Sequence, residues 1–178
     1  MPQDISSNSI YIEKSIEHIF LSALIQYAWK ENLPQIEIAS SEIDNNGYDV
    51  ILSTGGITRF VQLKSSAITS KRNRTEINVQ LQNKPSGCIV WVWYSRADLS
   101  IQSFLFYGNK PGKKMNDISK FKNAQATRLT AKGVRPVRMH TKNIPKSYLT
   151  RVVDISSLYK ILFGKQQRVT YPVAGSPS

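Results

Sequence analysis

The stretch from residue 47 to residue 64 constrains the fold more than any other part of the sequence. It reads GYDVILSTGGITRFVQLK, in which two short β-rich runs flank the pair Gly55-Gly56. Two glycines between such runs are typical of a two-residue hairpin turn. A turn of this type places Thr54 opposite Ile57 and so fixes the register of both strands. The stretch therefore predicts a β-hairpin.

The predicted register gathers polar side chains on one face of the hairpin. Pairing outward from the turn sets Asp49 opposite Gln62 and Gly47 opposite Lys64, and directly opposed residues point to the same face. Gln62 and Lys64 also share that face because alternate residues of a strand do so. A carboxylate, an amide oxygen and an ammonium group in one cluster can hold a hard divalent cation beside a phosphate. This face is the candidate active site.

A helix predicted before the hairpin supplies a further carboxylate. Apolar residues in the segment 9–32 repeat at the three-and-four spacing of a core-facing helix, and Glu17 lies at the edge of that stripe. A glutamate in such a place is usually part of a solvated flank. A metal site on the hairpin, however, needs a second carboxylate from outside the sheet, so Glu17 is a candidate ligand.

The remaining sequence predicts a mixed α/β domain. Residues 88–94 (CIVWVWY) form a continuous apolar run, which is the pattern of a central strand covered on both faces. Other segments predict two more strands and two more helices around it. We expect a loose N-terminus over residues 1–8, a single domain over 9–164 and a flexible tail over 165–178. The further strands are predicted at residues 35–39 and 103–107, and the helices at 115–132 and 154–163.

The charge of the chain favours a polyanionic partner. Twenty-four Lys and Arg against 12 Asp and Glu give a net charge of +12, which suits nucleic acid or an anionic membrane. No run approaches the roughly 20 apolar residues of a membrane span, and no secretory signal is recognisable. The single cysteine, Cys88, fits a reducing compartment. These features predict a cytoplasmic, nucleic-acid-binding protein without a membrane partner.

Two basic segments are the candidate nucleic-acid contacts. Guanidinium and ammonium groups suit phosphate oxygens, although charged runs of this kind are as often simply solvated loops. The first segment holds Lys71, Arg72 and Arg74, and the second holds Arg135, Arg138, His140, Lys142 and Lys146.

The order of the predicted elements resembles that of the PD-(D/E)XK nuclease superfamily, the fold of restriction endonucleases and Holliday-junction resolvases. This order is a helix with Glu17, a strand, a hairpin with Asp49 and Gln62-Leu63-Lys64, and then an apolar strand. The resemblance covers roughly residues 9–107 and implies a restriction-endonuclease-like α/β fold, with a mixed central sheet flanked by helices. It also implies a Mg²⁺-dependent endonuclease that acts on DNA in restriction, repair or recombination, with Mn²⁺ as a substitute metal.

The resemblance also implies roles for individual residues. Asp49 corresponds to the metal-binding aspartate of the first motif, and Lys64 to the lysine that contacts the scissile phosphate and positions the attacking water. Glu17, Gln62 and the backbone carbonyl of Leu63 would complete the metal shell. The second motif acid is replaced by Gln62, whose amide oxygen carries no charge, and the proline before the aspartate is replaced by Tyr48.

Two alternatives remain open from the sequence. A catalytically inactive nucleic-acid-binding module of the same fold fits the basic charge equally well, and Gln62 points toward it. An RNA-associated protein with a chance hairpin match fits less well, because short motifs often occur by chance. If the chain does cut duplex DNA, two active sites are required, which predicts a homodimer.

Overall fold

The computed structural model describes residues 5–40, 47–126 and 128–170, with side chains from residue 8 onward. Its helices are α1 (Ile5–Lys30) and α2 (Ile155–Phe163), and its short 3-10 helices are η1 (Val79–Asn83) and η2 (Lys146–Tyr148). Its strands are β1 (Glu37–Ser40), β2 (Val50–Thr54), β3 (Ile57–Ala67), β4 (Arg74–Asn78), β5 (Gly87–Tyr94), β6 (Ile101–Gly108), β7 (Asn123–Gln125), β8 (Val137–Pro145) and β9 (Thr150–Val152).

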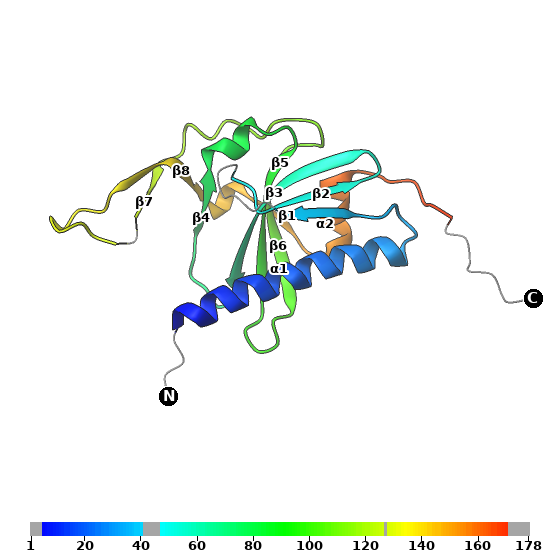
Figure 1. Cartoon of the computed structure of the whole chain (residues 1–178), viewed down its shortest axis with the longest axis horizontal. Helices are drawn as coiled ribbons and strands as arrows, with labels where there is room; N and C mark the ends of the chain where they lie inside the picture. Colours follow the sequence, from blue (N-terminus) through cyan, green and yellow to red (C-terminus); the bar gives the residue numbers. More distant parts are fainter. Residues whose placement is uncertain (1–4, 41–46, 127, 171–178) are drawn as a thin grey trace, which may run out of the picture.

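The strands form two sheets (Figure 1). The central sheet has six strands in the order β1-β2-β3-β5-β6-β9, and the second has three in the order β4-β8-β7. In the central sheet β3 and β5 run parallel, whereas all other neighbours are antiparallel. The chain leaves β3 for β4 in the second sheet and returns to β5, so this crossover links the two sheets. The predicted α/β class with a mixed central sheet is confirmed.

Each face of the central sheet buries its own core. Both helices pack on one face, where α1 inserts Ile16, Phe20 and Leu24, three fully buried residues at the predicted spacing. On the opposite face the second sheet and its connections bury a separate cluster that includes Ile77 and Ile144. β5 contributes alternate residues to the two clusters, and all eight of its residues are buried. The central strand expected at residues 88–94 is therefore confirmed.

The hairpin has the expected register. Thr54 pairs with Ile57 across the Gly55-Gly56 turn, and the ladder continues to Val50 opposite Val61. Both turn glycines have positive φ, at 54° and 76°, which glycine adopts at little cost. The ladder ends there, so the two pairs expected beyond it, which involve Asp49 and Gly47, do not form part of it.

Three expectations about the elements need correction. The helix expected over residues 115–132 is wrong, because this region holds turns and the short strand β7. The first helix begins at Ile5 rather than at residue 9. The basic segment around Arg74 continues into β4 rather than remaining a loop.

The C-terminal helix is confirmed: Asp154 caps α2, and Gly164 follows its last residue. In the described part of the chain, neither helix is both long and apolar enough to cross a membrane.

A buried arginine connects the hairpin to the C-terminal helix through hydrogen bonds. The side chain of Arg59 in β3 is fully buried. Its Nε donates to the carbonyl of Leu162 at 2.6 Å, and its Nη2 donates to that of Ile161 at 2.8 Å. Its Nη1 donates to the carbonyl of Asn109 at 2.8 Å. Two of these acceptors belong to the last turn of α2, whose carbonyls have no partner within the helix. Arg59 thus completes the helix end and holds the hairpin in place.

Candidate active site

A cleft of about 810 Å³ opens where four parts of the fold meet. Its walls come from the first half of α1, the segment leading into β2, the middle of β3, and the β4–β8 pair. It brings together Glu17, Asp49, Leu63 and Lys64, four of the five residues that the sequence assigned to the active site. The fifth, Gln62, is not among the residues that line it.

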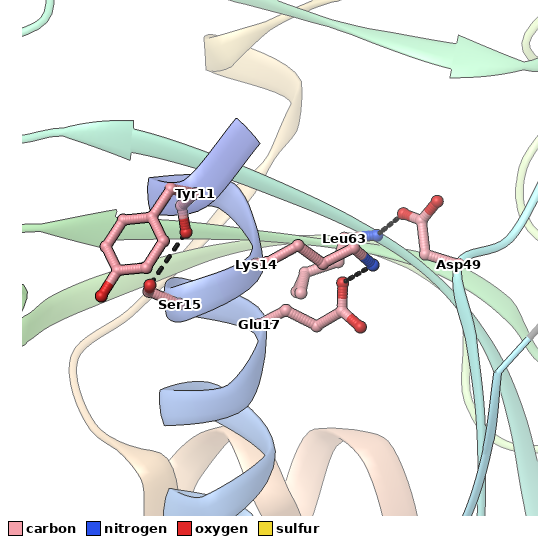
Figure 2. Close-up of polar contacts among 6 residues, drawn as sticks. All are labelled: Tyr11, Lys14, Ser15, Glu17, Asp49 and Leu63. Atoms are coloured by element: carbon pink, nitrogen blue, oxygen red, sulfur yellow. Dashed lines mark hydrogen bonds and ion pairs between the residues drawn. The ribbon is translucent and has the colours of Figure 1, made fainter. Parts of the chain in front are cut away.

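The helix wall presents one face of α1. Ile10, Glu13, Lys14 and Glu17 line the cleft, and their spacing of three and four residues places them on one side of the helix. Lys14 Nζ lies 3.0 Å from Glu17 Oε2, and Figure 2 shows both side chains extending from the helix toward the strand that carries Leu63. Glu17 retains only 16% side-chain exposure, whereas Lys14 retains 66%. The carboxylate of Glu17 is therefore largely enclosed, beside a more exposed cationic group.

Asp49 is held against β3 by its own backbone and side chain. Its N–H donates to the carbonyl of Val61 at 2.9 Å. Its Oδ2 accepts a hydrogen bond of 2.6 Å from the N–H of Leu63 (Figure 2). This backbone donor fixes one carboxylate oxygen at the point where the hairpin ladder ends. The expected closeness of Asp49 to the 62–64 segment is therefore observed, although the contact runs through the backbone of Leu63.

Gln62 and Lys64 are placed differently although they share a face of β3. Lys64 is half-buried and lines the cleft. Gln62 is 9% exposed, and its Oε1 lies 3.4 Å from the N–H of Asn78 at the end of β4. Its amide therefore faces the second sheet rather than the cleft. A role for Gln62 as a metal ligand stays a prediction.

Pairing of β4 with β8 unites the two basic segments. Arg74 pairs with Pro145 and Asn78 with Thr141, so segments about 65 residues apart in sequence become neighbours. Arg72 and Arg74 from the first segment and Arg138 from the second line the same cleft. Arg138 forms a 2.6 Å ion pair with Glu76. Among the described residues, Arg72, Arg74 and Lys64 have no carboxylate within ion-pair distance. These three cations are available to an anionic ligand.

The other predicted nucleic-acid contacts lie around the cleft or farther away. A second hollow, of about 650 Å³, shares Arg74, Glu76 and Asn143 with the cleft and also includes Arg135. Lys146 lies over the ring of Trp93 at 3.8 Å, and Lys142 Nζ is 3.4 Å from the carbonyl of Ser119. Lys71 and His140 are exposed and line neither hollow.

Sequence reasoning missed several polar residues of the cleft, among them Lys14, Glu76 and Asn143. Lys14 could have been found, because a lysine three residues before Glu17 lies on the same helix face. Glu76 and Asn143 could not, since they reach the cleft only through the β4–β8 pairing.

The donor set suits an oxygen-preferring cation that keeps most of its own waters. In the described ranges, no three His, Cys, Asp or Glu side chains lie close enough to form a metal site by themselves. Mg²⁺ needs less than that, because it commonly takes one or two carboxylates together with waters and phosphate oxygens. Glu17 and Asp49 line one cleft and can supply those carboxylates.

Neither protein-family models nor curated proteins give a match to this chain. Among solved structures, a bacterial homing endonuclease aligns with 51% of this chain at 23% sequence identity and a TM-score of 0.27. The aligned part covers 59% of that chain, so this chain spans about three-fifths of that enzyme's length. With so low a TM-score, the alignment adds nothing to the assignment of the site, which rests on the geometry described above.

Proposed function

We propose that the protein is a metal-dependent endonuclease that hydrolyses phosphodiester bonds of DNA. The observation that supports this most directly is the composition of the cleft. It combines carboxylates from two separate elements, Glu17 and Asp49, with Lys64 and with two arginines, Arg72 and Arg74, that have no carboxylate partner in the described part of the chain. Carboxylates suit a divalent cation, and the cationic side chains suit phosphate oxygens.

Mg²⁺ is the proposed cofactor, with Mn²⁺ as a substitute, and Glu17 and Asp49 are the residues that would hold it. A bound divalent cation would supply a water of lowered pKa and neutralise charge that develops on the phosphate. The backbone carbonyl of Leu63 is a further proposed ligand, and the N–H of the same residue donates to Asp49 Oδ2. For Gln62 to act as a metal ligand, its side-chain amide would have to move away from the N–H of Asn78.

The cationic side chains have separate tasks in this proposal. Lys64 holds a non-bridging oxygen of the scissile phosphate and orients the attacking water, since it lies in the cleft with Asp49. Arg72 and Arg74 contact phosphates next to it, because they line the same cleft. Cleavage of both strands needs two copies of the site, so we also propose a homodimer, which light scattering would measure.

One observation favours a second candidate function, a DNA-binding module of the same fold without catalysis. Gln62 replaces an acid in sequence and also lies outside the cleft lining. Of the proposed metal ligands, only Glu17 and Asp49 then carry a negative charge, and Glu17 is already paired with Lys14. Such a module would bind DNA through the same cations and would leave every phosphodiester intact.

Cleavage assays separate the two functions. The assays compare four proteins: wild type, Asp49→Asn, Lys64→Ala and Lys110→Ala. Each is incubated with plasmid, linear, single-stranded and branched DNA in Mg²⁺, in Mn²⁺ and in chelator. Lys110 is exposed on a loop outside the cleft and serves as the charge-matched control. We expect wild type and Lys110→Ala to cut only with metal, and the two cleft variants to cut at least about 100-fold more slowly.

Binding measured in chelator accompanies these assays, because both cleft variants should retain most of their affinity. Cleavage by Asp49→Asn at the wild-type rate, or cleavage by wild type in chelator, would contradict the proposed nuclease. Binding by wild type without cleavage of any substrate would instead support the inactive module.

A further inference from the structure

The polypeptide between β7 and β8 forms a projection that the proposed catalytic chemistry does not use. We call residues 123–126 and 128–140 the arm. At its base Ala124 pairs with Arg138 and Gln125 with Val137. Farther out, the N–H of Ala126 donates to the carbonyl of Pro136, and that of Thr130 to Val134. The arm is therefore a hydrogen-bonded two-stranded ribbon that continues the β7–β8 pair, and Figure 1 shows it extending away from the central sheet.

The arm buries little against the rest of the protein. Every residue from 128 to 140 is exposed. The exposed side chains include four large apolar ones: Leu129, Val134, Val137 and Met139, with exposures between 53% and 68%. A ribbon that only had to follow phosphates would have no need of apolar side chains. Their presence on a free projection indicates a surface that is covered by a partner.

The charge of the arm identifies the kind of partner. From residue 118 to residue 153 the chain contains no Asp or Glu, and the arm itself carries Arg128, Lys132, Arg135 and Arg138. Two copies of so basic a ribbon repel one another, which disfavours pairing between arms. A polyanion is attracted for the same reason.

We propose that the arm inserts into the major groove of duplex DNA; this inference rests on the proposed action on DNA and specifies double-stranded substrate. The major groove, about 12 Å wide, admits a two-stranded β-ribbon, whereas proteins that bind the minor groove, about 6 Å wide, commonly bend or kink the duplex. Arginine can bond guanine O6 and N7 in that groove, and apolar side chains can contact thymine methyl groups. The combination of arginines and exposed apolar residues on the arm matches both kinds of contact.

The base of the arm adjoins the cleft, so one duplex can occupy both. Arg138 belongs to the arm and also lines the cleft with Glu17, Asp49 and Lys64. Gln125 and Arg135 of the arm line the second hollow, which shares Arg74 with the cleft. Cationic side chains thus continue from the cleft to the arm, along a path suited to a phosphate backbone.

The test is a dimethyl sulfate footprint on duplex DNA in chelator, where binding does not depend on cleavage. This reagent methylates guanine N7, which faces the major groove. Wild type is compared with Arg128→Ser/Arg135→Ser and with Leu129→Ser/Val134→Ser. The control is Lys110→Ser/Lys113→Ser, which removes the same charge from an exposed loop. All altered side chains are exposed, so circular dichroism and thermal midpoints should match wild type.

We expect wild type and control to protect guanines of the bound duplex and to prefer duplex over single strand. The arginine variant should lose protection and bind about tenfold or more weakly. The apolar variant should lose thymine-dependent preference with a smaller loss of affinity.

Unchanged protection in the arginine variant, or equal binding of single strands and duplex by wild type, would overturn the inference. So would a change of oligomeric state in either arm variant, because the arm would then contact a second copy. Protection in chelator together with no cleavage in Mg²⁺ or Mn²⁺ would support the arm while refuting the nuclease, and cleavage in metal without protection in chelator would do the reverse.

Discussion

Through three side-chain hydrogen bonds, Arg59 connects β3 to α2 and to Asn109. Replacement by leucine would leave three carbonyls without their donor: the buried one of Leu162 and the partly buried ones of Ile161 and Asn109. Because each unsatisfied buried polar group costs about 1–3 kcal/mol, we expect Arg59→Leu to lower the free energy of unfolding by at least about 3 kcal/mol. Urea unfolding measures the loss. Arg96→Leu, at an exposed position, should change it by less than about 0.5 kcal/mol.

Cys88 makes stability depend on alkaline pH. Burial raises the pKa of its thiol from 9.0 to about 12, with a smaller opposing effect from Arg59. The folded state therefore keeps a proton that the unfolded state loses above pH 9, so stability falls as the pH rises toward 12.

Urea unfolding of wild type and Cys88→Ala at about pH 8 and about pH 10.5 measures this effect. Between these pH values, the free energy of unfolding of wild type should fall by on the order of 2 kcal/mol more than that of Cys88→Ala. Equal losses in the two proteins would show that the thiol does not titrate in this way. The thiol of the folded protein should also resist alkylation at neutral pH.

Single residues were predictable where the backbone ladder determined their place. The Gly55-Gly56 turn fixed the pairing from Thr54 to Val50, and Asp49 and Lys64, which lie beyond the end of that ladder, line the same cleft. The ladder stops before Asp49, so the facing position expected for Gln62 did not follow. The packing of Gln62 near Asn78 depends on β4, whose position no local pattern reveals.

At the scale of elements, α2 offers a direct test of how a capping hydrogen bond stabilises a helix. Asp154 Oδ1 accepts a 2.7 Å hydrogen bond from the N–H of Ser157, which lowers the pKa of the Asp154 carboxyl below 3.8. Loss of such a cap costs about 1 kcal/mol, so Asp154→Ala should lower the thermal midpoint.

The contribution of Asp154 is fully present above its unfolded pKa and is lost as the pH falls through the lower folded pKa. The difference between wild type and Asp154→Ala should therefore shrink below about pH 4. A constant difference down to pH 2 would contradict a role for the ionised cap. Calorimetry across this range gives both midpoints.

The incorrect helix at residues 115–132 shows where periodicity misleads. Met115, Ile118 and Phe121 are buried at a spacing of three, as in a helix. The N–H of Ile118, however, donates to Gln82 Oε1, and Asp117 accepts from both the N–H and the hydroxyl of Ser119. Side chains thus take the backbone donors that a helix would use. For α1 and α2 the sequence patterns predicted a helix correctly, although α1 begins at Ile5 rather than at residue 9.

At the scale of the whole molecule, the distribution of charge predicts a strong dependence of DNA binding on salt. The affinity of a protein for DNA falls with salt in proportion to the number of phosphates it neutralises, with a slope of about −0.9 per contact. Arg72→Ala/Arg74→Ala should therefore make the slope shallower by about 2, whereas Lys110→Ala should leave it unchanged. Fluorescence anisotropy in chelator between low and moderate salt measures both slopes. A flat response in wild type would exclude phosphate contacts as the main source of affinity.

The contact between Arg59 and α2 also affects the order in which a newly made chain can fold. Arg59 and Leu162 lie 103 residues apart in sequence. At about 5–20 residues per second, a ribosome needs on the order of 5–20 seconds to synthesise the interval between them. Until α2 emerges, the hairpin that carries Asp49 and Lys64 lacks its anchor, and the core of α1 lacks Leu158 and Leu162. Nascent chains that end before α2 should therefore be substrates for chaperones and proteases, and the cleft would assemble only after α2 has been synthesised.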